Sequence, residues 1–356
     1  MKNFFVLIKN LFGAVSKTAS SHNASVKTAS SNNASVKTAS KNKKASHQSA
    51  SVKKIAKTLH TTTGKLYRFS RDTDSHYRRV LIPKASGGTR VLNTPQHELK
   101  SLQRSIARHL LASYELSPYA TAYRSGISLK DNASPHVGHR YLLKMDICDF
   151  FGSITFGKVL SSVFPSTRYP KHVGVMLTAI CCKGSVLPQG APTSPAISNI
   201  VMNSFDNTLG KWCNKHGITY TRYCDDLTFS ANTPLADLYL RAEDMLLRWG
   251  FTVNHNKTHF ILNSSRQSVT GLVVNQKVTV PSSYKRELRQ ELYYTLKFGP
   301  DDAVKRSDIA KKRHLDASQY LQCLLGRVGY VLQIEPQNAW FIQARKQLKA
   351  LANNSF

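Results

Sequence analysis

The chain has 356 residues, among them 50 lysines and arginines against 20 aspartates and glutamates, so its formal net charge is +30. Residues 1–60 hold eleven lysines and no acid, so the remainder still carries +19 (30 minus 11) and is basic in its own right. Such an excess predicts a polyanionic partner and favours a nucleic-acid groove. Anionic membrane is the competing polyanion, but no apolar run approaches the roughly eighteen residues of a transmembrane span, so no stable membrane insertion is expected.

The first residues predict an amphipathic helix over residues 1–16. Lys9 and Asn10 interrupt the apolar run too early for a signal peptide. The helix could dock on its own core, on a partner or on a membrane surface, and its periodicity does not decide between these. One helical face carries its apolar residues, Phe4, Ile8, Leu11 and Val15.

Residues 17–51 contain a ten-residue repeat, "KTASSHNASV", "KTASSNNASV" and a degraded "KTASKNKKAS". A segment rich in Ser, Asn, Ala and Lys cannot offset its ordering entropy by burial, which predicts a disordered basic linker. Its regular lysines suit a solvated spacer and a non-specific RNA tether equally well.

Order is expected near Lys53. "YRRVLIPKASGGTRVLNTP" predicts a strand, a Gly-Gly turn and a strand, with Lys84 and Arg90 on either side of the turn. This basic hairpin is either a solvated face or a cover for a triphosphate, which Arg90 would bind bidentately. The following segment predicts a helix with four apolar positions at helical spacing, Leu99, Leu102, Ile106 and Leu110.

Three carboxylates stand out. "YLLKMDICDFF" is an apolar strand that contains Asp146, and a buried carboxylate needs a cation or strong donors. Asp225 and Asp226 lie between strand-forming runs in "YTRYCDDLTFS", where they are either a hairpin tip or metal ligands. If the two strands pair, the three carboxylates converge and can hold two Mg²⁺ ions. Asp149 is a weaker candidate, with a helix cap as its alternative.

The loop "LPQGAPTSP" enters a helix through a turn rich in proline. Gln189 could hydrogen-bond a base or sugar, and Gly190 lets backbone N–H groups face a nucleotide. The six cysteines show no C-x-x-C spacing and the thirteen histidines are scattered. These counts favour reduced thiols in a cytoplasmic protein and argue against zinc.

Five motifs now stand in a fixed order, namely "IPKASGGTR", "MDICDFF", "LPQGAPTSP", "RYCDD" and "NHNKT". Together they resemble the fingers and palm of a reverse transcriptase. "NASPH", from Asn132 to His136, and "VTG", from Val269 to Gly271, resemble two signatures of the retron branch. The resemblance covers about residues 53–345; the N-terminal repeat and Cys224, where the family more often has Ala, depart from it.

The resemblance implies an α+β right-hand polymerase with fingers 52–140, a catalytic palm 141–275 and a helical, RNA-binding thumb 276–356. The periodicity and composition of the preceding residues add a disordered basic extension, with the helix of residues 1–16 and the linker 17–51. Carried over by motif, the metal ligands are Asp146, Asp225 and Asp226. The expected nucleotide contacts are Lys84, Arg90, Phe151, Gln189, Gly190 and Lys257. The expected RNA contacts are Asn132, His136, Tyr284, Arg286 and Arg289.

Two of these roles are specific. The resemblance implies that Lys257 protonates pyrophosphate and that Phe151 lies under the sugar and excludes a 2′-hydroxyl, although Phe151 could equally be core filler.

The implied activity is RNA-directed DNA polymerisation. The resemblance implies that the enzyme uses deoxynucleotides and copies part of its own structured non-coding RNA into a branched RNA–DNA molecule (msDNA), in antiphage defence with a separately encoded effector. Two alternatives stay open: another bacterial reverse transcriptase, of the group II intron or diversity-generating type, and a non-catalytic RNA-binding scaffold. The three intact carboxylates argue against the scaffold.

Overall fold

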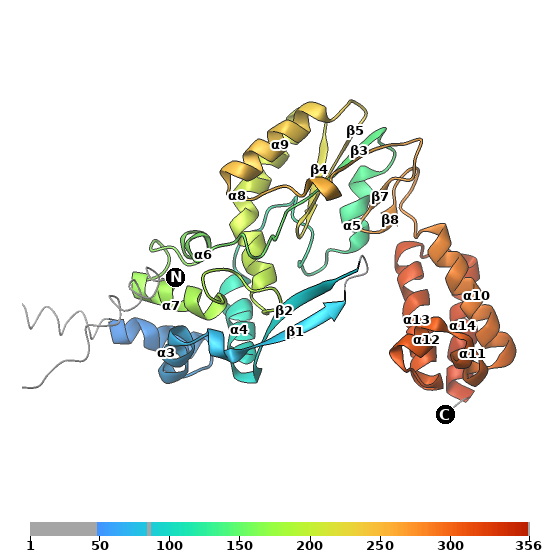
Figure 1. The fold of residues 1–356 in the computed structure, drawn as a ribbon, viewed down its shortest axis with the longest axis horizontal. Helices are drawn as coiled ribbons and strands as arrows, with labels where there is room; N and C mark the ends of the chain where they lie inside the picture. The colour runs from blue at the N-terminus through green and yellow to red at the C-terminus, as the bar shows by residue number, and fades with distance from the viewer. Residues whose placement is uncertain (1–47, 84–86, 355–356) are drawn as a thin grey trace, which may run out of the picture. The chain divides into compact units, whose positions relative to one another are not determined.

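The computed structural model describes residues 48–83 and 87–354 (Figure 1). The predicted helix over residues 1–16, nearly all of the linker 17–51 and Lys84 lie outside the described residues. By its internal contacts the chain divides into two compact units, and each is described below by itself.

The first unit takes the residues up to Glu115 together with Asp149–Met202. It begins in a helix over residues 48–58, so the last four residues of the predicted linker are helical. Val52 and Ala56, four residues apart, are buried on one face of this helix. The longer elements that follow are α3 Thr63–Arg71, β1 Tyr77–Pro83, β2 Thr89–Pro95, α4 His97–Ile106, α6 Phe156–Ser162 and α7 Lys171–Cys181.

β1 and β2 form the predicted hairpin, which Figure 1 shows as a long two-stranded ribbon. The strands are antiparallel, with Tyr77 opposite Pro95. Gly87 and Gly88, at the described end of the turn, have φ values of 87° and 76°. Glycine adopts this left-handed backbone without a steric penalty, so the Gly-Gly pair allows the chain to reverse here.

α4 confirms the helix predicted after the hairpin. All four of its predicted apolar positions, which continue into the π-helical turn Ala107–Leu111, are buried. Between them Gln103 is also buried, and its side-chain amide donates to the Tyr77 hydroxyl at 2.7 Å and to the Ile180 carbonyl at 2.8 Å. The helix is therefore tied to both β1 and α7.

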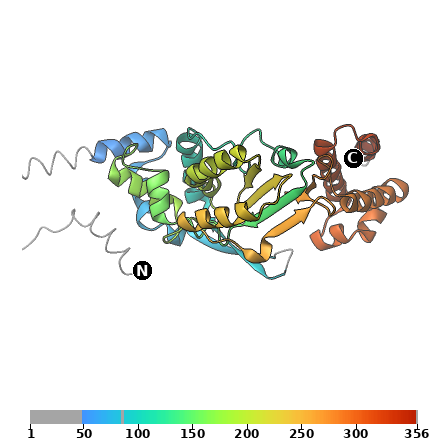
Figure 2. The same ribbon diagram turned by 90° about the horizontal axis from the view of Figure 1, so that it is seen from above.

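The second unit takes Leu116–Cys148 and Asn203–Phe356 and contains a four-stranded antiparallel sheet in the order β4-β5-β3-β6. α9 (Ala236–Arg248) and the C-terminal part of α8 (Ser194–Lys215) lie against one face of this sheet (Figures 1 and 2). α9 buries Leu238, Ala242 and Leu246, which recur every four residues. The strands are β3 Tyr141–Asp146, β4 Thr219–Tyr223, β5 Asp226–Ala231 and β6 His259–Leu262.

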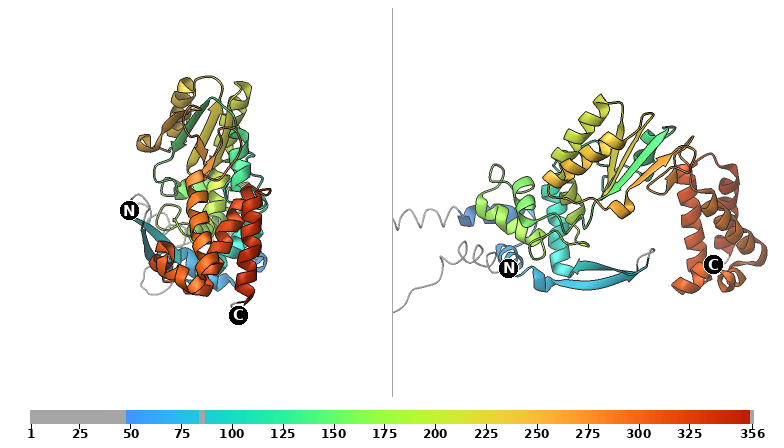
Figure 3. Two further views of the ribbon diagram at one scale, coloured as in Figure 1. Left: turned by 90° about the vertical axis from the view of Figure 1, so that its right-hand side faces the viewer. Right: turned by 45° about the horizontal axis from the view of Figure 1, so that its top comes forward.

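A helical bundle completes the second unit, as Figure 3 shows. Its buried side chains, such as Leu288 and Leu324, share one apolar cluster with Leu142 of β3 and with Val269 and Leu272. The bundle and the sheet therefore have a continuous core. Its helices are α10 Ser282–Phe298, α11 Pro300–Arg306, α12 Asp308–Arg313, α13 Ala317–Ile334 and α14 Ala339–Asn354. Short elements between sheet and bundle are α5 Leu129–Ala133, the 3₁₀ turn Ser134–His136, β7 Ser268–Val269 and β8 Leu272–Val273.

The α+β fold class is confirmed. The two compact units cut the chain at other points than the predicted boundaries, because residues 116–140 belong with the sheet and Asp149–Met202 belongs with the hairpin. No disulfide joins the six cysteines, all of which lie in the described part of the chain. Among the helices of that part, none has both the length and the apolar composition to cross a membrane.

Candidate active site

Two strands bring the predicted carboxylates together. β3 pairs with β5 so that Asp146 lies directly opposite Asp226, which confirms the expected pairing. The hairpin between β4 and β5 has Cys224 and Asp225 at its tip, and the Ile147 amide donates to the Asp225 carbonyl at 3.0 Å. Side chains of directly opposed residues lie on one face of a sheet, with Cβ atoms about 4.5–5.5 Å apart. Strand register therefore gathers these carboxylates at one end of the sheet.

Asp146 is held by the segment "NHNKT". Its side chain is almost fully buried, and Lys257 Nζ lies 2.8 Å from its Oδ1 atom. The Asn254 side-chain amide donates to Oδ2 at 3.2 Å, while the Asn254 backbone amide donates to the Asp146 carbonyl at 2.7 Å. Sequence reasoning missed Asn254, although it lies in a motif that had been singled out. Lys257 compensates the charge of a buried carboxylate, which without a cation would be costly.

The carboxylates perturb one another. Burial, followed by the charge of Asp225, raises the pKa of Asp226; Asp146 adds to this, whereas Lys144 and Lys257 oppose it. The hydrogen bond to Asp146 raises the pKa of Lys257, and the negative charges of the three aspartates act in the same direction. The site thus has an excess of negative charge that its own lysines do not fully balance.

The donor set fits a hard divalent cation. Carboxylate oxygens are the ligands that Mg²⁺ prefers, and a bound cation would offset both the burial and the repulsion that raise the pKa of Asp226. Within residues 48–83 and 87–354 no three His, Cys, Asp or Glu side chains form a ready-made ligand set. The Asp146 carboxylate is turned to Lys257 instead, so side-chain rotation of the paired aspartates would have to complete such a set.

In the first unit, the Gln189–Gly190 loop is attached to β2, and both segments carry expected nucleotide contacts. The Asn93 amide of β2 donates to the Gln189 carbonyl at 2.8 Å. Gly190 has a φ of 117°, and a Cβ atom on it would lie 2.9 Å from the Asn93 carbonyl oxygen. Only glycine permits this close approach. The loop is therefore fixed to the strand on which Arg90, an exposed side chain, lies three residues earlier.

The structure distinguishes the two roles considered for Phe151, sugar selection and core filling, through its neighbour Phe150. Phe150 is buried, whereas Phe151 is only half-buried, and their ring centroids lie 5.5 Å apart. The core-filling role thus falls to Phe150, and Phe151 retains exposed surface. Asp149 has a φ of 39° in the turn before them and precedes no helix directly, so it is not a helix cap.

Replacing Phe151 with Ala is expected to increase ribonucleotide incorporation relative to deoxynucleotide incorporation. Truncating a fully buried Phe lowers the free energy of unfolding by about 3–5 kcal/mol, and truncating the half-buried Phe151 should lower it by less. Single-nucleotide extension with matched ribo- and deoxynucleotides measures the ratio, with Phe150→Leu as a control for core packing. Unchanged sugar selectivity in a folded variant would remove Phe151 from the nucleotide site.

Asn132 and His136 do not reach the surface. Both side chains are fully buried. The Asn132 carbonyl accepts from the Thr121 hydroxyl at 2.6 Å, and the His136 ring lies 2.7 Å from the Ser230 hydroxyl and 2.9 Å from that of Thr221. Buried side chains with paired polar atoms are not available to RNA. The expectation that these two residues contact RNA is therefore replaced by a structural role beneath β4 and β5.

His136 should make the fold sensitive to acid. Burial, with a smaller contribution from His139, lowers the pKa of His136 from 6.5 to about 3. At a pH between these two pKa values, the unfolded chain binds a proton at His136 that the folded chain does not. The free energy of unfolding therefore falls as the pH falls below about 6.5. We expect His136→Gln to flatten this decline in urea titrations from pH 7 to 5, whereas the exposed His97→Gln should not. An unchanged slope in the His136 variant would contradict this role.

The expected RNA contacts on α10 differ from one another. Arg286 and Arg289 are exposed, whereas Tyr284 is half-buried, with its ring 5.7 Å from that of Tyr330. Tyr284 thus packs against the bundle core with part of its side chain exposed, and its role as an RNA contact stays a prediction. The Arg289 guanidinium lies 5.3 Å from the ring centroid of Trp340. Trp340 on α14 remains 43% exposed and was missed, because nothing in its sequence context indicates a neighbour on α10.

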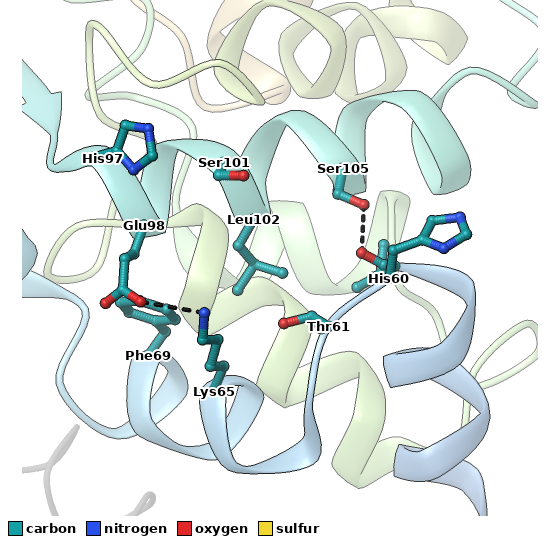
Figure 4. A pocket seen from close by; sticks show the side chains of 10 residues that line it. His60, Thr61, Lys65, Phe69, His97, Glu98, Ser101, Leu102 and Ser105 are labelled. Atoms are coloured by element: carbon teal, nitrogen blue, oxygen red, sulfur yellow. Dashed lines mark hydrogen bonds and ion pairs between the residues drawn. The ribbon is translucent and has the colours of Figure 1, made fainter.

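A cavity of about 280 Å³ lies in the first unit between α3 and α4 (Figure 4). It contains the Lys65–Glu98 ion pair at 3.2 Å, and Glu98 also accepts from Arg68. Both basic groups are thus engaged by the same carboxylate, which balances one of their two positive charges. None of its lining residues is among the expected site residues, and we assign it no ligand.

Comparisons with known proteins place the chain in a family. Residues 82–287 match the family described as reverse transcriptase (RNA-dependent DNA polymerase). The retron Mx65 reverse transcriptase of Myxococcus xanthus is 33% identical over 316 residues, covering 82% of this chain and 70% of the relative. The retron Ec86 reverse transcriptase of Escherichia coli is 34% identical over 228 residues, covering 62% and 70%.

Among solved structures, apo telomerase from Candida tropicalis aligns with a TM-score of 0.44 at 13% identity, covering 78% of this chain and 58% of that one. A structural similarity at that TM-score does not support a family assignment. The family assignment rests on sequence instead, because the matched residues 82–287 span the paired aspartates, the "NHNKT" segment and the Gln189–Gly190 loop. The chain therefore belongs to the retron-type reverse transcriptases and is an RNA-directed DNA polymerase.

Proposed function

We propose that the enzyme reverse-transcribes part of its own structured non-coding RNA into msDNA, primed from a 2′-hydroxyl of that RNA. We further propose that the complex acts in antiphage defence with a separately encoded effector. The observation that carries the proposal is the register of Asp146 opposite Asp226, next to Asp225, in a chain related to retron reverse transcriptases. A decayed, non-catalytic scaffold would have no need to keep this cluster of repelling carboxylates.

In the proposed site, Asp146, Asp225 and Asp226 hold two Mg²⁺ ions. The chemistry that such ions would supply is activation of the attacking hydroxyl and neutralisation of the triphosphate and leaving pyrophosphate. Lys257, once released from Asp146, is still protonated at neutral pH, as lysine side chains ordinarily are, and can donate a proton to pyrophosphate. This assigns the lysine two successive partners, a carboxylate at rest and a phosphate during turnover.

The first unit supplies the proposed nucleotide contacts. Lys84 and Arg90 of the hairpin bind the triphosphate, and Gln189 with the Gly190 backbone contacts the incoming nucleotide. Phe151 lies under its sugar. The attachment of the Gln189–Gly190 loop to β2 supports this set, because it fixes the loop to the strand that carries Arg90. In terms of subdomains, we propose that residues 52–140 act as fingers, 141–275 as palm and 276–356 as RNA-binding thumb.

The nature of the bound nucleic acid tests the proposal. The protein is purified from its native host, and the nucleic acid that accompanies it is treated separately with RNase and with DNase. We expect each enzyme to shorten the product without destroying it, because msDNA is RNA joined to DNA. The Asp225→Asn/Asp226→Asn variant, which should still bind RNA, is the control and should yield only RNase-sensitive material. A product from the unaltered protein that RNase removes completely would contradict the proposal.

A further inference from the structure

The tip of the β4–β5 hairpin is a strained turn. Cys224 has a φ of 61°, a left-handed conformation that is unfavourable for a residue with a side chain. Asp225, one residue on, has its direction set by this turn. Non-glycine residues persist in such conformations when the surrounding structure holds them there. The contacts around Cys224 therefore bear on where the Asp225 carboxylate points.

A buried ion pair lies beneath the tip. The Arg222 side chain is completely buried, and its Nε and Nη2 atoms contact the Asp206 carboxylate of α8 at 2.8 and 2.6 Å. The remaining terminal nitrogen, Nη1, donates to the Cys224 carbonyl at 2.8 Å. Asp206 also accepts from the Tyr220 hydroxyl at 2.8 Å. The guanidinium is thus oriented by Asp206, and its Nη1 atom donates to the strained residue.

A second contact reaches Cys224 through its side chain. The Tyr123 hydroxyl donates to the Cys224 sulfur at 3.1 Å, and Tyr123 itself has a φ of 60° and is 49% exposed. Cys224 as a residue is 8% exposed, and burial raises the pKa of its thiol to about 12. Carbonyl and side chain of the same turn residue are therefore each held by a separate donor.

We propose that Arg222, Asp206 and Tyr123 form a clamp that keeps Cys224 left-handed and thereby aims the Asp225 carboxylate. In this proposal all three are positioning residues of the polymerase, and none touches the substrate through the clamp. The inference rests on the proposed role of Asp225 as a metal ligand. It assigns a function to the buried ion pair, which apolar residues of similar volume could replace without loss of stability if folding were its only purpose.

The main test removes the ion pair without leaving a buried charge. The triple variant Arg222→Met/Asp206→Leu/Tyr220→Phe replaces the ion pair and the tyrosine hydroxyl bound to it by apolar groups and leaves Tyr123 in place. The matched control is Arg248→Gln/Asp244→Asn, which removes an exposed ion pair of α9 in the same unit. Thermal melting confirms that each variant is folded. We expect the triple variant to lower kcat by about 100-fold, the cost of misplacing a catalytic group by about 1 Å, with little change in KM for the nucleotide.

Thiol reactivity gives a readout that does not depend on catalysis. A loosened turn exposes the buried Cys224 side chain, so its alkylation by iodoacetamide, mapped by mass spectrometry, should accelerate at least about tenfold, as expected when a buried thiol becomes accessible. The buried Cys181 and Cys213 serve as internal references and should not change. Tyr123→Phe, which keeps the ring and loses only the hydroxyl, should show a smaller acceleration in the same direction.

The outcomes separate the two proposals. Faster alkylation of Cys224 together with lower kcat in the folded triple variant supports the clamp. Unchanged alkylation and unchanged kcat would overturn it, and so would a loss of kcat without any change at Cys224. If all three cysteines react faster, the network has only a general structural role. Failure of the proposed role of Asp225 would instead appear as full activity of Asp225→Asn with a normal clamp.

Discussion

Replacing Asp225 and Asp226 together by asparagine is expected to reduce DNA synthesis by orders of magnitude while RNA binding persists. Asparagine keeps the size of the side chain but removes the charge on which metal binding depends. Asp226 lies opposite Asp146 in the sheet, so both changes fall within the carboxylate cluster. Primer extension on an RNA template measures the loss, and a titration with labelled RNA shows whether binding is retained.

The same variant should be more stable than the unaltered protein. The pKa of Asp226 is raised in the folded chain, so above that pKa its charge costs folding free energy, which the neutral amide does not. We expect a higher melting temperature at neutral pH and a smaller difference in acid. Asp237→Asn/Asp244→Asn on the exposed face of α9 removes the same charge elsewhere and is the control. Undiminished DNA synthesis by the Asp225/Asp226 variant would refute the assignment of these ligands.

Changing Arg286 and Arg289 to alanine is expected to erode the preference for the cognate RNA over an unrelated hairpin. Both side chains are exposed on α10, and Arg289 lies against Trp340, which gives a planar cation and an aromatic surface side by side. Such groups read folded RNA through stacking and bidentate hydrogen bonds. Deleting residues 1–51 should leave the preference nearly intact, because this segment has no arginine and its aromatic rings other than histidine are confined to Phe4, Phe5 and Phe12, so its lysine-rich remainder contributes only a salt-sensitive term.

Competition titrations at several salt concentrations separate the two contributions. The matched control is Lys311→Ala/Lys312→Ala, which removes two exposed charges from α12 of the same bundle. It should weaken binding to both RNAs equally and reduce the salt dependence. The proposed separation of roles is contradicted if loss of residues 1–51 abolishes discrimination between the two RNAs while the double arginine variant retains it.

The carboxylate cluster was predictable from the sequence because it depends on strand register. Asp146 ends an apolar strand and Asp226 begins another, so antiparallel pairing of the two predicts their meeting. The hairpin of β1 and β2 and the apolar face of α4 were predictable for the same reason, since their spacing and turn residues are local. These features can be predicted from local periodicity, because each depends on the residues of one short segment.

Other parts of the site depend on contacts between distant segments. Nothing adjacent to Arg222 in sequence indicates that it would pair with Asp206, sixteen residues earlier on a helix, inside the core. Asn132 and His136 are polar residues in a recognisable signature, and a signature does not distinguish a contact to RNA from a buried hydrogen-bond network. Burial of polar residues is decided by partners that come together only in the folded chain.

The close approach of Gly190 to Asn93 restricts how the enzyme can be engineered. Any side chain at position 190 would meet a backbone oxygen at 2.9 Å in a backbone conformation that only glycine adopts readily. A mutant library that varies this position would consist mostly of misfolded loops, whatever nucleotide analogue is selected. Diversity intended to broaden substrate range belongs at the neighbouring Gln189, whose backbone alone is committed to β2.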